Sequence, residues 1–176
     1  MQLHAFFITV LLFMSSYKID FTTAELADWY IVNDGVMGGL SSGKAQITDE
    51  GFLFFGTVSL RNNGGFTSLR SVYREYDLQE FTEVEVRYKS TGLQQALQFS
   101  VNERFYVPNY KVHLPNSEQW VIKRFKLSEV QQYRLGDATG AYLTKGVLDD
   151  IIRISFITDE KKGGEFSLEV DYISFQ

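Results

Sequence analysis

An alternation of apolar and polar residues with a period of two runs through most of this chain after Trp29. In residues 83–89, EVEVRYK, apolar side chains alternate with charged ones, and residues 97–101, LQFSV, alternate in the same way. This period is typical of a half-buried antiparallel strand. Apolar runs at residues 52–60, 151–158 and 166–175 predict further strands, with a bulge or a close approach at the glycine of FFGT. The chain is therefore expected to form antiparallel sheets.

Turn-forming clusters separate the predicted strands, among them NDG at residue 33, RNNGG at residue 61 and DEKKGG at residue 159. Only residues 22–28 and 127–133 favour short helices. Many short strands with such turns predict an all-β sandwich or barrel, mostly antiparallel, with one or two short helices. Because 176 residues suit one domain better than two, we expect a single domain over residues 17–176.

The first 16 residues, MQLHAFFITVLLFMSS, have an apolar stretch that ends in two serines. Its length fits the apolar region of a signal peptide and is too short to cross a bilayer as a helix. An apolar first strand or a buried tail is the alternative, since no Lys or Arg precedes the stretch. We expect an exported, periplasmic protein without a transmembrane span in the mature chain; if the segment is not a signal peptide, the protein would be cytoplasmic.

Composition excludes several classes of site. The chain has no Cys, a formal charge of −5 and a pI near 5.1. The absence of Cys removes thiolate nucleophiles and cysteine-bound metals, and the acidic balance argues against nucleic-acid binding. Asn33, Asp34 and Asp137 are oxygen donors in turns, but they lack the spacing of a calcium loop. We therefore predict no metal and no cofactor.

The glycine-rich segment NDGVMGGLSSGKA, residues 33–45, raises the question of a phosphate-binding loop. Gly38 to Lys44 fits the spacing G-x-x-x-x-G-K. Ala45, however, stands where that motif requires a Ser or Thr hydroxyl for magnesium. A strand-like segment follows in place of the helix whose N-terminus would face the phosphates. Nucleotide binding by this segment is therefore not expected.

The chain offers no convincing catalytic set. A Ser-His-Asp triad would depend on His113, because the other histidine, His4, lies at the extreme N-terminus. A hydrogen-bonded structural role suits His113 better. Acidic pairs occur at residues 83 and 85, 149 and 150, and 159 and 160, but they lie on a polar strand face or near turns. We predict that the protein is not an enzyme.

Aromatic and amide side chains on a sheet can stack on sugars and hydrogen-bond to their hydroxyls. The predicted hairpin over residues 94–110 carries several such side chains, although many of the Tyr and Phe residues are expected to fill the core. The candidate ligand face comprises Arg87, Gln98, Arg104, Tyr106, Tyr110 and Trp120.

Residues 28–43, DWYIVNDGVMGGLSSG, suggest a family. They resemble the signature of the complex I intermediate-associated protein 30 family (NADH:ubiquinone oxidoreductase intermediate-associated protein), a Trp followed by a D-G-V-M-G-G-x-S core. The family-signature loop here comprises Trp29, Asn33, Asp34, Gly35, Val36, Met37, Gly38, Gly39 and Ser41. The likeness continues in order through GGFTSLRS at residue 64, EVEVRYKSTG at residue 83, the strand at Trp120 and GGEFSLEVDYISF at residue 163.

The resemblance implies a galactose-binding-like jelly-roll sandwich. Mitochondrial members of the family act as assembly factors for respiratory complex I and bind intermediates without catalysis. Because the first 16 residues are not Arg-rich like a transit peptide, we expect a bacterial stand-alone member whose client need not be complex I. In the family-signature loop, Gly35, Gly38 and Gly39 would allow positive φ or close approach, Asp34 would hydrogen-bond to backbone amides, and Met37 would fill an apolar gap.

Three functions remain open at this point. The leading hypothesis is a non-enzymatic binding module that recognises a protein partner or assembly intermediate. The alternative is a carbohydrate-binding module of the jelly-roll type that binds a glycan at the cell envelope. The third is a structural envelope protein without a discrete pocket.

Overall fold

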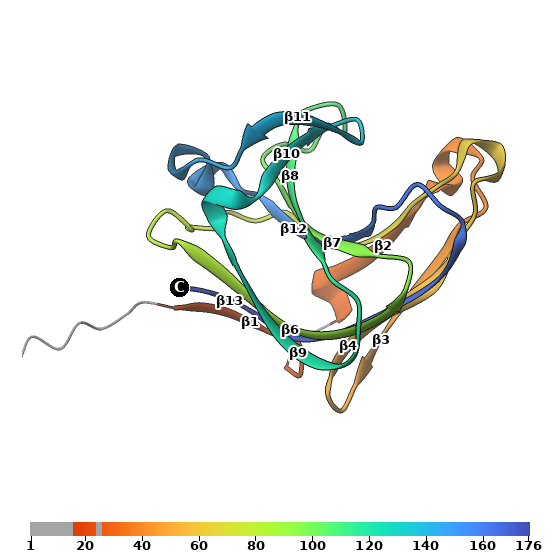
Figure 1. Cartoon of the computed structure of the whole chain (residues 1–176), viewed down its shortest axis with the longest axis horizontal. Helices are drawn as coiled ribbons and strands as arrows, with labels where there is room; N and C mark the ends of the chain where they lie inside the picture. The colour runs from red at the N-terminus through yellow and green to blue at the C-terminus, as the bar shows by residue number, and fades with distance from the viewer. Residues whose placement is uncertain (1–15, 24–25) are drawn as a thin grey trace, which may run out of the picture.

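The chain folds into two antiparallel β-sheets that pack face to face (Figure 1). The computed structural model describes residues 16–23 and 26–176, so the predicted leader lies outside the described residues except for Ser16. In the described part, no helix has the length and apolar character required to cross a membrane. The predicted all-β, mostly antiparallel sandwich is confirmed.

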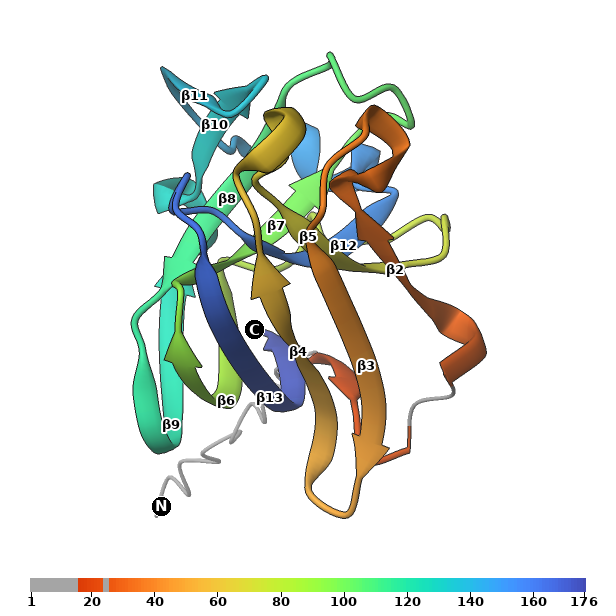
Figure 2. The same cartoon turned by 90° about the vertical axis from the view of Figure 1, so that its right-hand side faces the viewer.

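Sheet A has six strands in the order β3-β4-β13-β6-β9, with β1 paired to β13 (Figure 2). Its strands are β1 (Tyr17–Asp20), β3 (Ser42–Thr48), β4 (Gly51–Val58), β6 (Glu83–Gly92), β9 (Ser117–Lys126) and β13 (Gly164–Phe175). Sheet B has seven strands in the order β11-β10-β8-β7-β12-β5-β2. Its strands are β2 (Trp29–Asn33), β5 (Thr67–Ser71), β7 (Gln95–Ser100), β8 (Asn109–Leu114), β10 (Gln131–Arg134), β11 (Asp137–Tyr142) and β12 (Arg153–Thr158).

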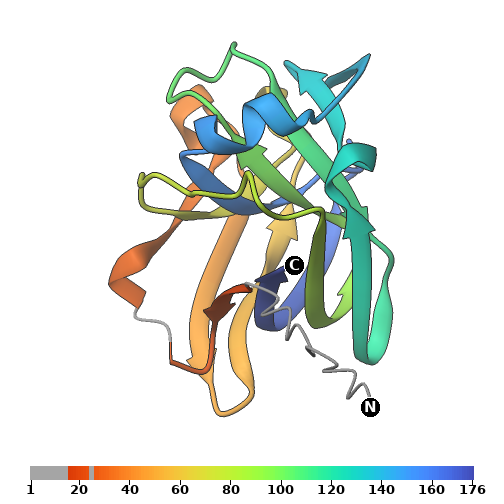
Figure 3. The same cartoon turned by 90° about the vertical axis from the view of Figure 1, so that its left-hand side faces the viewer.

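Short 3-10 helices occupy some of the connections (Figure 3). They are η1 (Leu26–Asp28), η2 (Asp34–Met37), η3 (Arg61–Asn63), η4 (Leu127–Glu129) and η5 (Lys145–Asp150). The helix predicted over residues 127–133 is only partly correct, because Gln131–Arg134 form β10. That segment pairs with β8, and sheet pairing here overrides the local helical preference.

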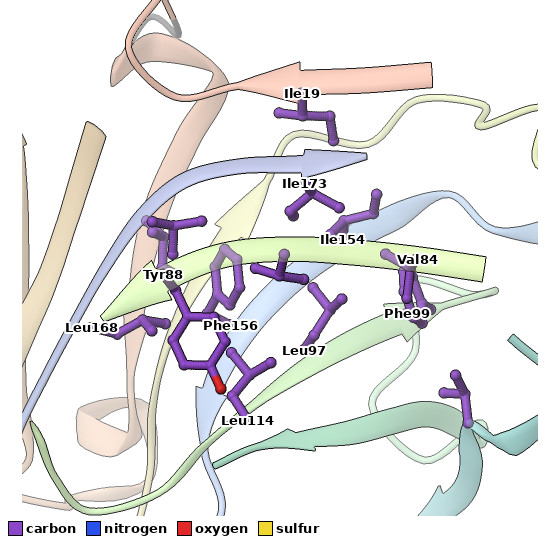
Figure 4. Packing of buried hydrophobic residues seen from close by; sticks show 14 of the residues in the cluster. Ile19, Val84, Tyr88, Leu97, Phe99, Leu114, Ile154, Phe156, Leu168 and Ile173 are labelled. Carbon is purple, nitrogen blue, oxygen red and sulfur yellow. The ribbon is translucent and has the colours of Figure 1, made fainter. Parts of the chain in front are cut away.

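The core lies between the sheets and is filled by the apolar positions of the alternating strands (Figure 4). Val84, Val86 and Tyr88 of β6 are fully buried, as the alternation predicted. They pack with side chains of β7 and β12 from the facing sheet. Complete burial of a side chain of this size stabilises the fold by about 1.5–3 kcal/mol.

Gly56 is the predicted close approach between β3 and β4. A Cβ at this position would lie 2.0 Å from the carbonyl oxygen of Ser42, and the residue has φ of 158°. No larger side chain fits without separating the strands. The prediction for this glycine is confirmed.

Candidate functional site

A cleft of about 550 Å³ lies over the face of sheet B that is turned away from the core. Residues 63–66 form one wall, and the β7–β8 connection, residues 102–108, forms another together with the β10–β11 turn. The β4–β5 connection and the β10–β11 hairpin stand at opposite ends of sheet B in Figure 1. The sheet thus supplies a rigid floor, and the loops supply the walls.

Two rows of directly paired residues make up most of the floor, next to Ile157. Because paired residues in an antiparallel sheet lie on the same face, each row presents its side chains to the cleft side. The first row, from β5 through β12 and β7 to β8, is Arg70, Ser155, Gln98 and Lys111. The second row, from β12 through β7 to β8, is Arg153, Ser100 and Asn109. Every side chain of these rows is polar.

Arg153 is a buried cation at one end of this floor. Its side chain is held against two aromatic rings, with the guanidinium carbon 3.5 Å from the ring centre of Tyr73 and 5.5 Å from that of Tyr30. It donates hydrogen bonds to the hydroxyl of Tyr30 and, at 3.3 Å, to the carbonyl of Ser71. The residue is only 5% exposed. These contacts fix the guanidinium in position without neutralising its charge.

Arg70 lies beside Arg153 on the neighbouring strand. Its Nε donates a 2.8 Å hydrogen bond to the hydroxyl of Ser68. Burial, and secondly the charge of Arg153, lower the pKa of the Arg70 guanidinium below its ordinary value. Within residues 16–23 and 26–176, neither arginine forms a salt bridge with a carboxylate. This end of the floor therefore carries uncompensated positive charge.

The other end of the floor holds a compensated cluster. Lys111, 4% exposed, donates a 2.6 Å hydrogen bond to Asp159. His113 Nε2 lies 2.8 Å from the other carboxylate oxygen. Burial would raise the pKa of Asp159, but hydrogen bonds from His113 and Lys111 hold it below its ordinary value. No serine hydroxyl of the described chain hydrogen-bonds to His113, so these residues do not form a Ser-His-Asp triad.

Two polar atoms of the floor residues have no hydrogen-bond partner within the described residues. They are the hydroxyl of Ser155, a residue that is 0% exposed, and the side-chain oxygen of Asn109. Buried polar groups are normally paired, since desolvation without a partner costs about 1–3 kcal/mol. Asn109 lines the cleft, so its unpaired oxygen is a candidate for contact with a ligand or its bridging water, whereas Ser155 lies beneath the lining residues.

The family-signature loop does not line the cleft but supports one of its walls. Asp34, 1% exposed, accepts hydrogen bonds from the amides of Ser41 at 3.1 Å, Gly65 at 2.7 Å and Phe66 at 3.3 Å, and from the Ser41 hydroxyl. Burial would raise the pKa of Asp34, but these hydrogen bonds hold it below its ordinary value. The predicted bonding of Asp34 to backbone amides is confirmed, and it links the β2–β3 connection to the wall at residues 63–66.

The glycines of this region serve different purposes. Gly38 has φ of 86° and ends η2, as predicted. A Cβ on Gly39 would lie 2.2 Å from Asp34 Oδ1, so this position confirms the predicted close approach. Gly35 shows neither feature, and its predicted role is wrong because the space around it is open. The side chains of Val36 and Met37 lie outside the described residues, so the predicted packing of Met37 stays a prediction.

The other residues of the family-signature loop secure its ends. Asn33 accepts hydrogen bonds from the amide of Gly43 at 2.9 Å and the hydroxyl of Thr67 at 2.6 Å, which ties the end of β2 to β3 and β5. Trp29 is buried in the core, where its ring lies 5.0 Å from that of Phe21. Asn33 therefore joins the loop to β3 and β5 by hydrogen bonds, and Trp29 anchors the start of β2 in the core.

The six candidate ligand residues do not share one surface, which corrects the single face expected from the sequence. Gln98 and Arg104 line the cleft, and Tyr106 is exposed in the adjacent connection. Tyr110 is only 6% exposed and belongs to the core, because it alternates with Lys111, whose side chain is on the cleft side. The remaining two, Arg87 and Trp120, lie on sheet A and stack on each other at 4.6 Å.

Sequence reasoning missed most of the floor. The residues that it did not select are Arg70, Asn109, Lys111, Arg153 and Ser155. One signal was available, since Arg153 interrupts the apolar run IIRISFIT. A charged residue inside a buried strand is rare unless it has a specific partner or role.

Comparison with known protein families gives one match. The sequence profile of the family described as Complex I intermediate-associated protein 30 (CIA30) matches residues 19–170. No curated protein is a significant sequence match to the chain. The family match covers both sheets and the cleft.

Solved structures share the fold at low sequence identity. The family 11 carbohydrate-binding module of the cellulosomal cellulase Lic26A-Cel5E of Clostridium thermocellum has a TM-score of 0.64 and 15% identity, over 92% of this chain and 94% of that one. The same module family from that organism, in complex with a β-1,3-1,4-mixed-linked tetrasaccharide, has a TM-score of 0.62 and 16% identity, over 91% and 94%. The K2 cleaved adhesin domain of Lys-gingipain has a TM-score of 0.50 and 11% identity, over 92% and 99%. The predicted galactose-binding-like jelly-roll fold is thereby confirmed.

Proposed function

This chain belongs to the complex I intermediate-associated protein 30 family, and from that premise we propose that it is a non-enzymatic module that binds a segment of a partner protein in the cleft over sheet B. The partner is an assembly intermediate of the kind that respiratory complex I assembly factors bind. The client of this chain need not be complex I itself.

The observation that carries the proposal is the combination of the cleft with exposed apolar residues around it. Phe105 and Leu135, which line the cleft from two different connections, are 81% and 62% exposed. Leu60, beside the opposite wall at Gly65, is 51% exposed. Exposed apolar side chains around a concave site are typical of protein interfaces, whose energetic centres are rich in aromatic residues and Arg.

The charged groups of the cleft support a binding role over catalysis. Asp159 is engaged by Lys111 and His113, so it is not poised as a free general base. Among the described residues, no group of three or more His, Asp and Glu is arranged to hold a metal ion. A hydrolase or transferase activity that survives purification and disappears in His113→Ala or Asp159→Asn would overturn the non-enzymatic part of the proposal.

The experiment is affinity capture of the tagged chain from its native host, with variants of the two surfaces compared in parallel. We expect Phe105→Ser combined with Leu135→Ser to lose the co-purifying partner, because these side chains border the cleft. Ile122→Ser is the matched control, since Ile122 is 53% exposed on sheet A, on the opposite side of the sandwich. Equal recovery of the same partner by all three proteins would contradict the proposal.

Glycan binding in the same cleft is the second candidate. It is favoured by the polar floor formed by Gln98, Ser100 and Asn109 and by the fold shared with a module solved in complex with a tetrasaccharide. A glycan array, run with calcium and with a chelator, tests it. Binding that Asn109→Ala abolishes, without any captured protein partner, would replace the leading proposal; an array at background in both conditions would remove this candidate.

We also propose that the protein works outside the cytoplasm. The support is the apolar segment over residues 5–14, followed by Ser15 and Ser16, which suits a signal peptide. Fractionation of the native host, with mass spectrometry of the N-terminus, tests this. Recovery of the intact N-terminus from the cytoplasmic fraction would contradict it.

A further inference from the structure

We infer that Arg70 and Arg153 form a subsite for a carboxylate, carried by an acidic side chain of the segment that the cleft binds. The inference rests on the proposed function and adds to it the chemistry of the partner. An acidic segment is one in which Asp or Glu residues lie among apolar residues, which would contact the exposed side chains around the cleft.

The distribution of charge gives the first argument. The whole chain has a net charge of −5, yet the cleft is lined by more basic than acidic side chains. Two of its cations are paired in the described structure, Lys111 with Asp159 at 2.6 Å and Lys161 with Asp137 at 2.9 Å. Arg70, Arg104 and Arg153 line the same cleft and have no such partner in the described residues. An anion that enters the cleft meets uncompensated positive charge.

The cost of this arrangement gives the second argument. Burial of a cation without a counterion is unfavourable, and two such cations on adjacent strands repel each other. The fold nevertheless holds Arg153 between Tyr30 and Tyr73 and orients Arg70 through Ser68. Guanidinium groups fixed in this way are preorganised for the planar, two-oxygen geometry of a carboxylate.

Ser155, which lies beneath the two arginines, agrees with this assignment. It pairs with Arg70 on one side and with Gln98 on the other, so its side chain is on the same side of sheet B as theirs, although Ser155 itself does not line the cleft. The residue is 0% exposed, and the hydroxyl has no hydrogen-bond partner in the described chain. The polar groups beneath this end of the cleft are thus not all satisfied by the described chain, which agrees with a polar or charged ligand above them.

The apolar rim decides between two sources of the carboxylate. A uronic acid of a glycan and a Glu of a protein offer the same charged group. A sugar ring can stack on Phe105, but a protein segment carries apolar side chains that can cover both Phe105 and Leu135, which are 81% and 62% exposed. The structure therefore favours an acidic peptide segment, and an acidic sugar is an outcome that the test must separate.

The test measures binding of a hexaglutamate peptide by calorimetry at low and at physiological salt, with hexaglutamine as the neutral control. We expect hexaglutamate alone to bind, more weakly as salt rises. Arg70→Gln should reduce its affinity about 10- to 100-fold, as expected for loss of hydrogen bonds to a charged group. Arg153→Lys keeps the charge but not the guanidinium fork, and should also weaken binding. Arg87→Gln, the same charge change on sheet A, should leave the affinity unchanged, and thermal melting verifies that each variant is folded.

Several outcomes would overturn the inference. One is an unchanged affinity of Arg70→Gln for hexaglutamate, and another is no detectable binding of hexaglutamate to the unmodified protein. A protein that binds oligogalacturonate but not hexaglutamate would assign the subsite to acidic sugars. Capture of the native partner separates this result from the proposed function. A partner that is lost with Phe105→Ser but retained with Arg70→Gln would leave the binding module standing and remove the carboxylate subsite.

Discussion

The outer faces of the two sheets differ in whether their basic residues form ion pairs with carboxylates. On sheet A, ion pairs join β6 to both of its neighbours: Arg87 with Asp171, Arg124 with Glu85, and Lys89 with Glu169 at 2.7 Å. Arg87 and Lys89 also lie over the ring of Trp120, at 4.6 and 4.8 Å. The arginines and the lysine of these pairs are thus neutralised by carboxylates within the protein.

The outer face of sheet B holds its arginines differently. Arg70 and Arg153 have aromatic and hydroxyl neighbours and, in the described chain, no carboxylate. They line a cleft, whereas each of the three sheet A cations lies against a carboxylate. A face that is optimised for stability pairs its charges, and a face that binds a ligand leaves some of them for the ligand.

The largest difference in stability is expected between two variants that each lose one carboxylate, one next to the cleft and one on sheet A. Asp34→Asn should lower the free energy of unfolding by about 3 kcal/mol, because a buried acceptor of several hydrogen bonds loses part of its set. Asp171→Asn, whose partner Arg87 is partly exposed, should cost less than about 1 kcal/mol. Urea unfolding of both variants measures the difference, and equal losses would show that the wall next to the cleft has no special anchor.

A second variant tests the role of the family-signature loop in supporting the cleft wall. Gly38→Val should cost about 2 kcal/mol, because a β-branched residue is strained at positive φ, here 86°. Partner capture should persist at temperatures where the variant is folded. Unchanged stability together with lost capture would contradict the supporting role and assign the family-signature loop to the binding surface.

The ion cluster at the far end of the cleft predicts a dependence on pH. Burial raises the pKa of Asp159, but hydrogen bonds from His113 and Lys111 lower it. The resulting pKa lies below the ordinary value of 3.8. The contribution of Asp159, about 1.5 kcal/mol, is therefore fully present above that value and is lost as the pH falls through the lower folded pKa. Unfolding measured from pH 5 to lower pH should show a smaller acid dependence in Asp159→Asn; parallel curves would contradict the assignment.

The smallest effects compare arginines on the two faces. Arg70→Gln removes a desolvated charge that Arg153 repels, so the free energy of unfolding should stay constant or rise by up to about 1 kcal/mol. Arg87→Gln leaves Asp171 without its partner and should lower it by up to about 1 kcal/mol. Thermal and urea unfolding test the opposite signs. A clear loss of stability in Arg70→Gln would show that this arginine has a structural role.

The sequence determined the fold because alternation is a local property. A period of two in segments such as residues 83–89 places Val84, Val86 and Tyr88 on one face whatever the strand pairs with. The family-signature loop was equally readable, since Asp34 among glycines needs a turn whose amides it can bind. The sequence could not show which of those glycines is sterically required. A Cβ at Gly39 is excluded by the side chain of Asp34, and the position of that side chain is known only from the structure.

Only the tertiary structure decided where the cleft lies and which residues form its floor. Arg70 and Arg153 are 83 positions apart in the chain, and they meet because β5 and β12 pair in one particular register. A shift by one residue would send their side chains into the core. That no carboxylate of the described residues pairs with them is likewise a property of the assembled sheet, because pairing of charges depends on neighbours in space. Local periodicity therefore fixed which face each residue occupies, and long-range register fixed which residues share it.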